Sequence, residues 1–470
     1  MEDLIDITDN IIPMDDHKYF NEEETLELYQ TCINIMEEFI KDNHKIISDP
    51  EFESIFDENI EEIMHSHFDF DIFYNDEAEE EMEEIIDQAK NDLFKYFIPP
   101  RSYPDTIILT EPNYEELSVK IDILRKKPQP EQRTKEWYEF RHNLITASNA
   151  YKAFENQTTK NQLIYEKCQP LNHNLYIDQN ESVKEIVMVN TNTSLHWGQK
   201  YEPLSVKIYE YTYNTEVEDF GCIQHDNYLF IGASPDGINV KNDSQRYGRM
   251  LEIKNIVNRE IDGIPKKEYW IQMQLQMEVC NLNECDFLET KFIEYSDKQT
   301  YIEDTLTEIF EDEDGNEFNN VCLSKDEKMK GIIIYFHTKE GKPFYVYKPL
   351  DIVHPYDIED WEEKSLEYYQ ESDKYKYVYM KTIYWKLDII SCVLVCRNNQ
   401  WFKDNIGELG EIWQVIEKER ISGFDHRAPN KREKQKNDNI LDFTSSSPPV
   451  GKCLLQHNKD IGKITLTKLD

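Results

Sequence analysis

Two short segments combine residue types that can bind a metal ion and stabilise developing charge. Ser234-Pro235-Asp236-Gly237 follows an apolar stretch, and Glu252-Ile253-Lys254 lies further along the chain. In a β-strand, residues two apart face the same side, so Glu252 and Lys254 project together while Ile253 faces the opposite side. We therefore expect a carboxylate and an ammonium group to point into one pocket beside Asp236.

Such a pocket suits a hard divalent cation. Mg²⁺ prefers oxygen ligands and keeps several waters, so Asp236, Glu252 and the backbone carbonyl of Ile253 are candidate ligands, and Mn²⁺ suits the same set. The metal would polarise a phosphate and lower the pKa of a water, while Lys254 would orient that water or neutralise developing charge. Taken alone, each segment also fits an ordinary turn or a chance pairing of charges.

Two predicted helices add polar side chains to this pocket. An amphipathic helix opens just before Glu202 and puts it in the first turn, where the helix dipole favours a carboxylate. A second helix, over 267–280, places Tyr269, Gln272 and Gln276 on one face. The plainer alternatives are an N-terminal charge for Glu202 and a solvated stripe for the two glutamines.

The surrounding pattern predicts an α/β unit that would position these residues. Strands are expected over 217–225, 228–233, 250–255, 286–295 and 331–336, with a hairpin turn at Asp226-Asn227. Further helices are expected over 134–141, 146–154, 201–213 and 401–419. Trp385, Trp401, Phe402 and Trp413 are interpreted as core residues.

Charge and proline content divide the chain of 470 residues into five parts. They are an acidic helical region (1–98), a Pro-rich linker (99–129), the α/β core (130–300), a C-terminal α+β extension (301–422) and a flexible tail (423–470). Residues 1–100 hold 31 Asp and Glu against 5 Lys and Arg, so much of the net charge of −42 is concentrated there. The acidic region is interpreted as a solvated outer face, the alternative being a surface that mimics DNA or repels it.

Composition also bears on location and redox state. No secretory signal and no apolar run near the ~20 residues that span a bilayer are expected, so we predict a soluble intracellular protein without a membrane partner. Nine scattered cysteines favour reduced thiols, and their spacing predicts no iron–sulfur cluster.

Six motifs in order resemble those of the YqaJ and phage lambda exonuclease family, within the PD-(D/E)XK nuclease superfamily. They are Thr134-Lys135-Glu136-Trp137-Tyr138-Glu139-Phe140-Arg141, Ile145-Thr146-Ala147-Ser148, Trp197-Gly198-x-x-Tyr201-Glu202, Ser234-Pro235-Asp236-Gly237, Glu252-Ile253-Lys254 and Tyr269-x-x-Gln272-x-Gln274. The resemblance covers roughly residues 130–295 and implies a restriction-endonuclease-like core, in which helices flank a mixed central sheet.

The resemblance implies roles for individual residues. Asp236 and Glu252 would bind the metal, Glu202 and Gln272 would complete its shell of ligands and water, and Lys254 would be the catalytic lysine.

A terminal 5′ phosphate would be held by Arg141, Ser148 and Ser234, with Trp137 beside them. Arg presents a bidentate fork to phosphate, and Ser148 falls in the first turn of a helix that Thr146 is expected to cap. The alternative is that Trp137 is a core residue and Arg141 a surface ion-pair partner.

The resemblance implies an Mg²⁺-dependent exonuclease that digests duplex DNA 5′ to 3′ from its ends, in viral-type recombination, replication or repair. Two alternatives are an end-independent or structure-selective endonuclease, and a catalytically silent DNA-binding or scaffold protein. The expected partners are double-stranded DNA ends, a single-strand annealing protein and further copies of the chain. A viral protein of this kind would act in the host cytoplasm or at a viral replication site.

Overall fold

The computed structural model describes residues 19–43, 46–68, 75–94, 111–132, 134–171, 190–191, 193–312, 315–339, 341–371, 376–429, 454–458 and 463–467. They belong to two compact units, Met1–Ala428 and Pro429–Asp470. Residues 99–110 of the predicted linker and residues 430–453 of the predicted tail lie outside the described residues.

The second unit contains an antiparallel hairpin that the sequence analysis did not anticipate. Its strands are β13 (Leu454–Asn458) and β14 (Lys463–Thr467), with Leu454 opposite Thr467. The run Ile464-Thr465-Leu466-Thr467 alternates apolar and β-branched polar residues, which suits a strand.

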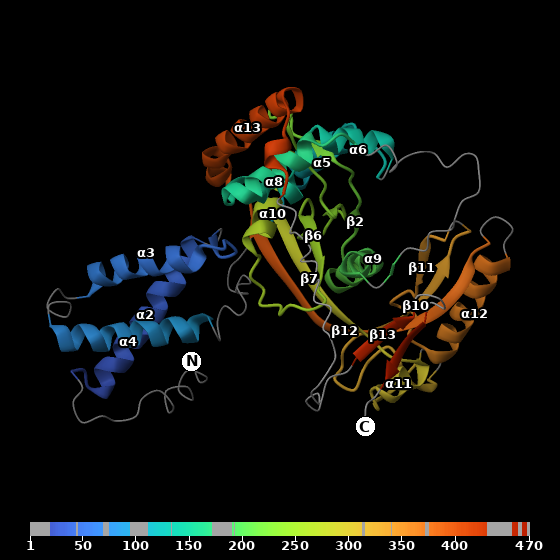
Figure 1. Cartoon of the computed structure of the whole chain (residues 1–470). Coiled ribbons are helices and arrows are strands. Elements are labelled where there is room, and N and C mark those ends of the chain that lie inside the picture. Colours follow the sequence, from blue (N-terminus) through green and yellow to red (C-terminus); the bar gives the residue numbers. More distant parts are fainter. Residues whose placement is uncertain are drawn as a thin grey trace, which may run out of the picture. The chain divides into compact units, whose positions relative to one another are not determined.

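Within its described residues the acidic region forms three α-helices, drawn in blue in Figure 1: α2 (Glu22–Asp42), α3 (Phe52–His67) and α4 (Asp76–Asp92). Asn21 caps α2 through a capping box with Glu24. The apolar side chains that recur at helical spacing, among them Cys32, Met36 and Phe56, form a core of their own. The charged faces therefore leave enough apolar surface to bury.

A seven-stranded mixed sheet forms the centre of the next part of the chain, in the order β11-β10-β12-β7-β6-β5-β2. Its strands are β2 (Val217–Glu218), β5 (Gly237–Asn239), β6 (Met250–Asn255), β7 (Glu284–Glu294), β10 (Lys330–His337), β11 (Pro343–Tyr347) and β12 (Val378–Cys396). The β6–β7 pair is parallel and the other pairs are antiparallel. One end of β12 pairs with β10 and the other with β7, so strands from the predicted extension continue the core sheet.

A smaller sheet and several helices complete the core. The sheet has the order β1-β4-β3, with β1 (Ile145–Thr146), β3 (Ile223–Gln224) and β4 (Ile231–Ala233). Around it lie α5 (Tyr114–Lys126), α6 (Lys135–His142), α7 (Ala147–Ala150), α8 (Gln157–Cys168) and α13 (Asn399–Ser422). Side chains of α5, α8 and α13, including Ile121, Leu163 and Ile416, share one buried cluster.

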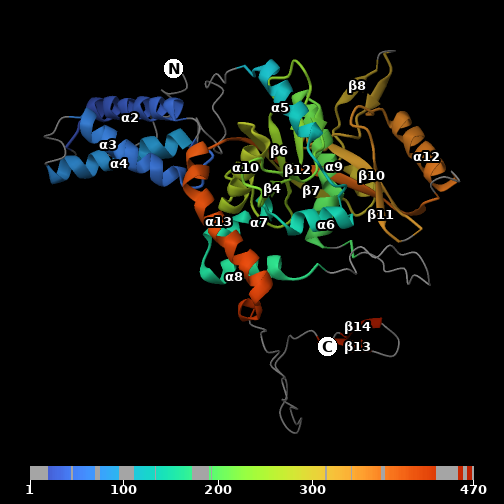
Figure 2. The same ribbon diagram turned by 90° about the horizontal axis from the view of Figure 1, so that it is seen from above.

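Two helices sandwich the strand that carries Glu252 and Lys254. Tyr209 of α9 (Ser194–Tyr213) packs with Leu251 and Ile253, whereas α10 (Lys267–Cys280) reaches Glu252 on the other face. Figure 2 shows α9 and α10 on opposite sides of the β6 and β7 strands. The alternation along β6 therefore divides an apolar face from a polar one.

Beyond β7 the chain adds α11 (Lys298–Glu303), the β8–β9 hairpin (Ile309–Glu311 and Glu317–Asn319) and α12 (Pro355–Glu371). Trp385 and Phe402 are buried, and Trp401 and Trp413 pack partly buried against the core, as predicted. None of the described helices combines the length and apolar character that a bilayer crossing needs.

The predicted α/β class, with helices flanking a mixed sheet, is confirmed, but three predicted elements were wrong in detail. The strand expected over 217–225 is two short strands in different sheets, because β2 pairs with β5 and β3 with β4. The helix expected from residue 201 begins at Ser194, where Thr193 caps it. The helix expected over 146–154 is the single turn α7 followed by a 3₁₀ turn, Tyr151–Phe154.

Candidate functional site

Asp236 lies immediately before β5 and is tied to the neighbouring strand β6. Its backbone N–H donates to the carbonyl of Leu251 at 3.1 Å, and its Oδ2 accepts the N–H of Ile253 at 2.7 Å. These two bonds hold the carboxylate beside the edge of β6. Gly237 lets β5 lie close to β2 on its other side, because a Cβ there would lie 2.1 Å from Cγ1 of Val217.

Glu252 is fully buried, with its carboxylate surrounded by donors. Its Oε1 accepts from the ammonium of Lys254 and, at 2.7 Å, from Nε2 of Gln272. Its Oε2 accepts from Nε2 of Gln276 at 2.7 Å. The structure therefore brings Glu252, Lys254 and Gln272 together as the sequence predicts, and the glutamines form no solvated stripe.

The charges in this pocket interact strongly. Burial and the neighbouring charge of Glu252 raise the pKa of Asp236 well above its usual range. Burial opposes the charge of Lys254, but Glu252, Asp236 and a hydrogen bond to Glu252 outweigh it and raise the pKa of the ammonium. Glu202 adds to the negative field at Asp236. One lysine thus faces more negative charge than it can neutralise.

The oxygen atoms of this pocket fit a divalent cation. Among the described contacts, no hydrogen bond reaches Oδ1 of Asp236, and Oε2 of Glu252 has one donor for its two lone pairs. The carbonyl of Ile253 lies on the same strand edge as its N–H, which points to Asp236. Within the described part of the chain, no three His, Cys, Asp or Glu side chains form a ready metal cluster, so water and substrate would supply other ligands, as Mg²⁺ prefers.

Glu202 occupies a different position from the one predicted. Because α9 begins at Ser194, Glu202 lies in the third turn and is exposed, so the stabilisation by the helix dipole does not apply. It lies one turn before Ser205, whose hydroxyl donates to Asn255 at the end of β6. Glu202 thus stands near the pocket's rim.

Three of the four residues predicted to bind phosphate are in contact. The guanidinium of Arg141 lies 4.6 Å from the ring centroid of Trp137 and donates to Oγ of Ser234 at 3.3 Å. Trp137 is half-buried, and helix α6 has no fully buried side chain. Trp137 is therefore not a core residue. The ring of Trp137 and the hydroxyl of Ser234 therefore orient the Arg141 guanidinium, and no carboxylate among the described residues pairs with it.

Ser148 joins this group through strand pairing. Strands β1 and β4 are parallel, with Thr146 beside Gly232, so Ser148 and Ser234 both follow strands that end at the same edge. Thr146 occupies the predicted N-cap position of α7, but its side chain makes no capping hydrogen bond and instead contacts Oγ of Ser148 at 3.4 Å. Since α7 is a single turn, its dipole is small.

Gln276, to which the sequence analysis assigned no role beyond its place on the same helix face as Gln272, contacts both parts of the site. Its Nε2 donates to Glu252 and, at 3.0 Å, to the carbonyl of Ser234. It thereby connects the carboxylate pocket to the residue that Arg141 contacts. Its place one helical turn after Gln272 was the available signal.

A second set of residues flanks Lys254. The Lys254 ammonium lies 4.8 Å from the ring centroid of Tyr269, and the guanidinium of Arg259 lies 5.8 Å from the same ring. Arg259 also pairs with Glu289, a buried residue opposite Lys254 on β7. Sequence spacing offered no signal for Arg259, because its contacts depend on how the loop after β6 folds.

An α/β core with Asp236 before one strand and Glu252 and Lys254 on the next has the arrangement of the PD-(D/E)XK class. Residues 136–283 match the family model described as YqaJ-like viral recombinase domain. Residues 136–283 are therefore similar to a YqaJ-like viral recombinase domain, and the resemblance drawn from the motifs is confirmed.

Other comparisons find similarity to one viral protein and to two crystal structures of a bacterial protein. An uncharacterized protein of Acanthamoeba polyphaga mimivirus is 29% identical over 336 residues, which are 67% of this chain and 57% of that protein. The chain thus aligns with less than two thirds of that relative's length. Two crystal structures of an alkaline exonuclease from Laribacter hongkongensis, one in complex with dAMP, are 16% identical and cover 61% of this chain and 94% of theirs, with a TM-score of 0.32.

Lys167 contacts the backbone of α6, and its buried charge makes the stability of the protein depend on pH. Its Nζ donates to the carbonyl of Arg141 at 2.8 Å. Burial, followed by the charges of Arg141 and Arg420, lowers the pKa of Lys167 from 10.5 to about 8. Between these values the unfolded chain binds more protons than the folded one, so this lysine makes stability rise as pH rises from about 8 to about 10.5.

We expect thermal melts to show this gain by comparison with Lys167→Met. From pH 8 to 10 the wild-type protein should gain up to about 3 kcal/mol relative to the variant, because groups common to both proteins cancel. A difference in Tm that stays constant over this range would contradict the buried, destabilised charge.

Proposed function

We propose that this chain is a divalent-metal-dependent exonuclease that hydrolyses phosphodiester bonds of duplex DNA 5′ to 3′ from its ends, in viral-type recombination, replication or repair. One observation carries the proposal: Asp236, Glu252 and Lys254 converge in one pocket inside a YqaJ-like viral recombinase domain. The sequence prediction named these three residues as the centre of the site.

The residues of the pocket have different proposed roles. Asp236 and Glu252 present the oxygen atoms that would hold the cation, with the Ile253 carbonyl and Glu202 as further candidate ligands, and Mg²⁺ or Mn²⁺ is the proposed ion. When bound, such a cation neutralises charge on a phosphate and lowers the pKa of water. Lys254 stays protonated and offers its ammonium to the negative charge that develops on the phosphate.

The second half of the proposal concerns DNA ends. Arg141 carries five N–H donors in a planar fork that matches a phosphate, and Trp137 and Ser234 hold it in place. Gln276 fixes Ser234 relative to Glu252. A 5′ phosphate on Arg141 would thus place a neighbouring phosphodiester bond at the carboxylates, and cutting would start at ends.

Two other functions stay open to experiment. An end-independent endonuclease would use the same carboxylates and lysine without relying on Arg141. A silent binding or scaffold protein is less well supported, because Asp236, Glu252 and Lys254 are all present and in contact. A single-strand annealing protein and further copies of this chain remain proposed partners, beside duplex DNA ends.

The catalytic assignment predicts loss of cutting on small, isosteric changes. Asp236→Asn and Lys254→Met should each lower the rate of nucleotide release from linear duplex DNA by at least about 10²-fold, because each removes a charge from the pocket. The control variants Asp226→Asn and Lys241→Met change exposed charges on the same part of the chain and should keep full activity. Chelation by EDTA should stop cutting.

Covalently closed circles serve as the second substrate in this assay. If the intact protein cuts them as fast as linear DNA, the endonuclease is the better description. If it cuts nothing with Mg²⁺ or Mn²⁺, the proposal of catalysis is wrong.

The phosphate pocket predicts a preference that one residue controls. The intact protein should digest 5′-phosphorylated ends faster than 5′-hydroxyl ends, and Arg141→Ala should reduce that ratio at least about tenfold, since a charge-assisted hydrogen bond to an ion contributes about 1.5–3 kcal/mol. Lys135→Ala, on the exposed face of the same helix, is the matched control. An unchanged ratio in Arg141→Ala would exclude Arg141 as the 5′-phosphate ligand.

A further inference from the structure

Two cations bind the carbonyl groups at the end of α6, the helix that carries Arg141. The last carbonyls of a helix have no partner within it, and α6 ends at His142. The carbonyl of Arg141 accepts from Nζ of Lys167 at 2.8 Å, and the carbonyl of His142 accepts from the guanidinium of Arg420 at 2.7 Å. Positive charge is also favoured at the C-terminal end of a helix dipole. Lys167 and Arg420 therefore hold this end of α6 in place.

Arg420 makes the larger number of these contacts. Its guanidinium also donates to Oδ1 of Asn143 at 3.1 Å and lies 3.1 Å from Nδ1 of His142. Its Nε donates to the carbonyl of Lys167 at 3.0 Å, and its guanidinium carbon lies 5.3 Å from the ring centroid of Trp413. A planar fork with five donors suits several acceptors at once. One side chain thus joins the end of α6 to both α8 and α13.

The helices behind Arg420 form a firm support. Helices α8 and α13 pack against each other, and Figures 1 and 2 both show them side by side. Leu163, Cys168 and Ile416 belong to the same buried cluster, and Sγ of Cys168 lies 3.6 Å from the carbonyl of Ile416. Closely packed interiors resist displacement. The end of α6 is therefore tied to a part of the core that moves little.

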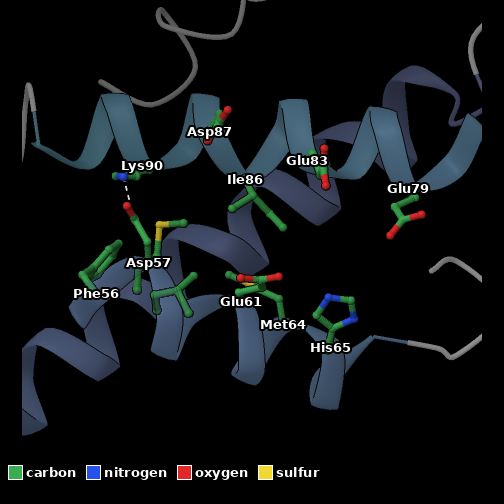
Figure 3. A pocket seen from close by; sticks show the side chains of 12 residues that line it. Phe56, Asp57, Glu61, Met64, His65, Glu79, Glu83, Ile86, Asp87 and Lys90 are labelled. Atoms are coloured by element: carbon green, nitrogen blue, oxygen red, sulfur yellow. Dashed lines mark hydrogen bonds and ion pairs between the residues drawn. The ribbon is translucent and has the colours of Figure 1, made fainter. Parts of the chain in front are cut away.

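The cations at this end of α6 have no acidic partner. Within the described residues no carboxylate forms an ion pair with Arg141, Lys167 or Arg420, and the groups that accept from Arg420 are neutral. The charges of Arg141 and Arg420 contribute to lowering the pKa of Lys167 to about 8. In the cavity between α3 and α4, by contrast, Lys90 is paired with Asp57 (Figure 3). An anion beside Arg141 would offset the repulsion among these three cations.

We propose that Arg420 and Lys167 are positioning residues for Arg141, and that they thereby set the preference of the protein for 5′-phosphorylated ends. They fix the end of α6, which keeps the Arg141 guanidinium between Trp137 and Ser234. Their charges add to the positive field that a phosphate at Arg141 experiences. They act through Arg141 and through this field.

This inference rests on the proposed function, in which Arg141 binds the 5′ phosphate, and it assigns part of that recognition to another region of the chain. Arg420 lies on α13, beyond the residues 136–283 that match the family model. Helix α13 would therefore contribute to the recognition of DNA ends as well as to the core.

The test measures kcat and KM of the full chain on linear duplexes that carry a 5′ phosphate or a 5′ hydroxyl. Arg420→Gln should raise KM for phosphorylated ends at least about fivefold and leave kcat within about twofold, because the carboxylates and Lys254 are untouched. For hydroxyl ends KM should change less than about twofold. Arg420→Lys keeps the charge without the fork, so its KM should lie between those of the intact protein and Arg420→Gln.

Two further variants separate positioning from general weakening. In Arg141→Ala/Arg420→Gln the preference for phosphorylated ends should equal that of Arg141→Ala alone, since Arg420 acts through Arg141. Arg427→Gln is the matched control, because Arg427 pairs with Glu419 in the same region and makes no described contact with α6. It should leave KM for phosphorylated ends within about twofold. Thermal melts identify any variant that is not folded at the assay temperature.

The outcomes distinguish this inference from the function on which it rests. An unchanged preference in Arg420→Gln and Arg420→Lys, an equal loss in Arg427→Gln, or a further loss in the double variant would overturn the inference and leave the proposed function standing. A preference that Arg141→Ala does not reduce would refute the phosphate site and the inference together. If Arg420→Gln does not fold, Arg420→Lys alone and combined with Arg141→Ala gives the same comparison.

Discussion

The carboxylate of Glu252 is buried in the protein interior, where an uncompensated charge costs several kcal/mol or more. Lys254, Gln272 and Gln276 compensate it through three hydrogen bonds from two elements. Helix α10 must therefore face β6 at this point, with both glutamines inward, and Lys254 must stay on the same side of the strand. The polar pocket and the packing of α10 on the sheet depend on this one charge.

This constraint extends from the carboxylates to the residues that would hold a DNA end. Gln276 donates both to Glu252 and to the carbonyl of Ser234, and the hydroxyl of Ser234 accepts from Arg141. The Arg141 guanidinium and the Glu252 carboxylate are thereby held by one connected set of hydrogen bonds. On the other face of β6, Tyr209 packs against Leu251 and Ile253, so the strand has little freedom to shift. Such rigidity suits a site in which a phosphate and its neighbour must be placed together.

The local sequence pattern predicted the strand and the helix that carry Glu252, Lys254 and Gln272 more accurately than the elements around them. The bounds of β6 and α10 agree with the predicted ones, because alternation and helical spacing are properties of neighbouring residues. The place of Glu202 was wrong because the start of α9 depends on the Thr193 cap. The pairing of β12 with β7 and the contact of Arg141 with Ser234 join residues about a hundred apart, and no local pattern reports such contacts.

The central claim is that Asp236 and Glu252 form a divalent-cation site, and anomalous diffraction from crystals grown with Mn²⁺ tests it most directly. We predict an anomalous peak within about 2.5 Å of carboxylate oxygens of both residues, and its loss in crystals of Asp236→Asn. Crystals with an empty Asp236–Glu252 pocket, or with manganese bound only at other carboxylates, would contradict the account.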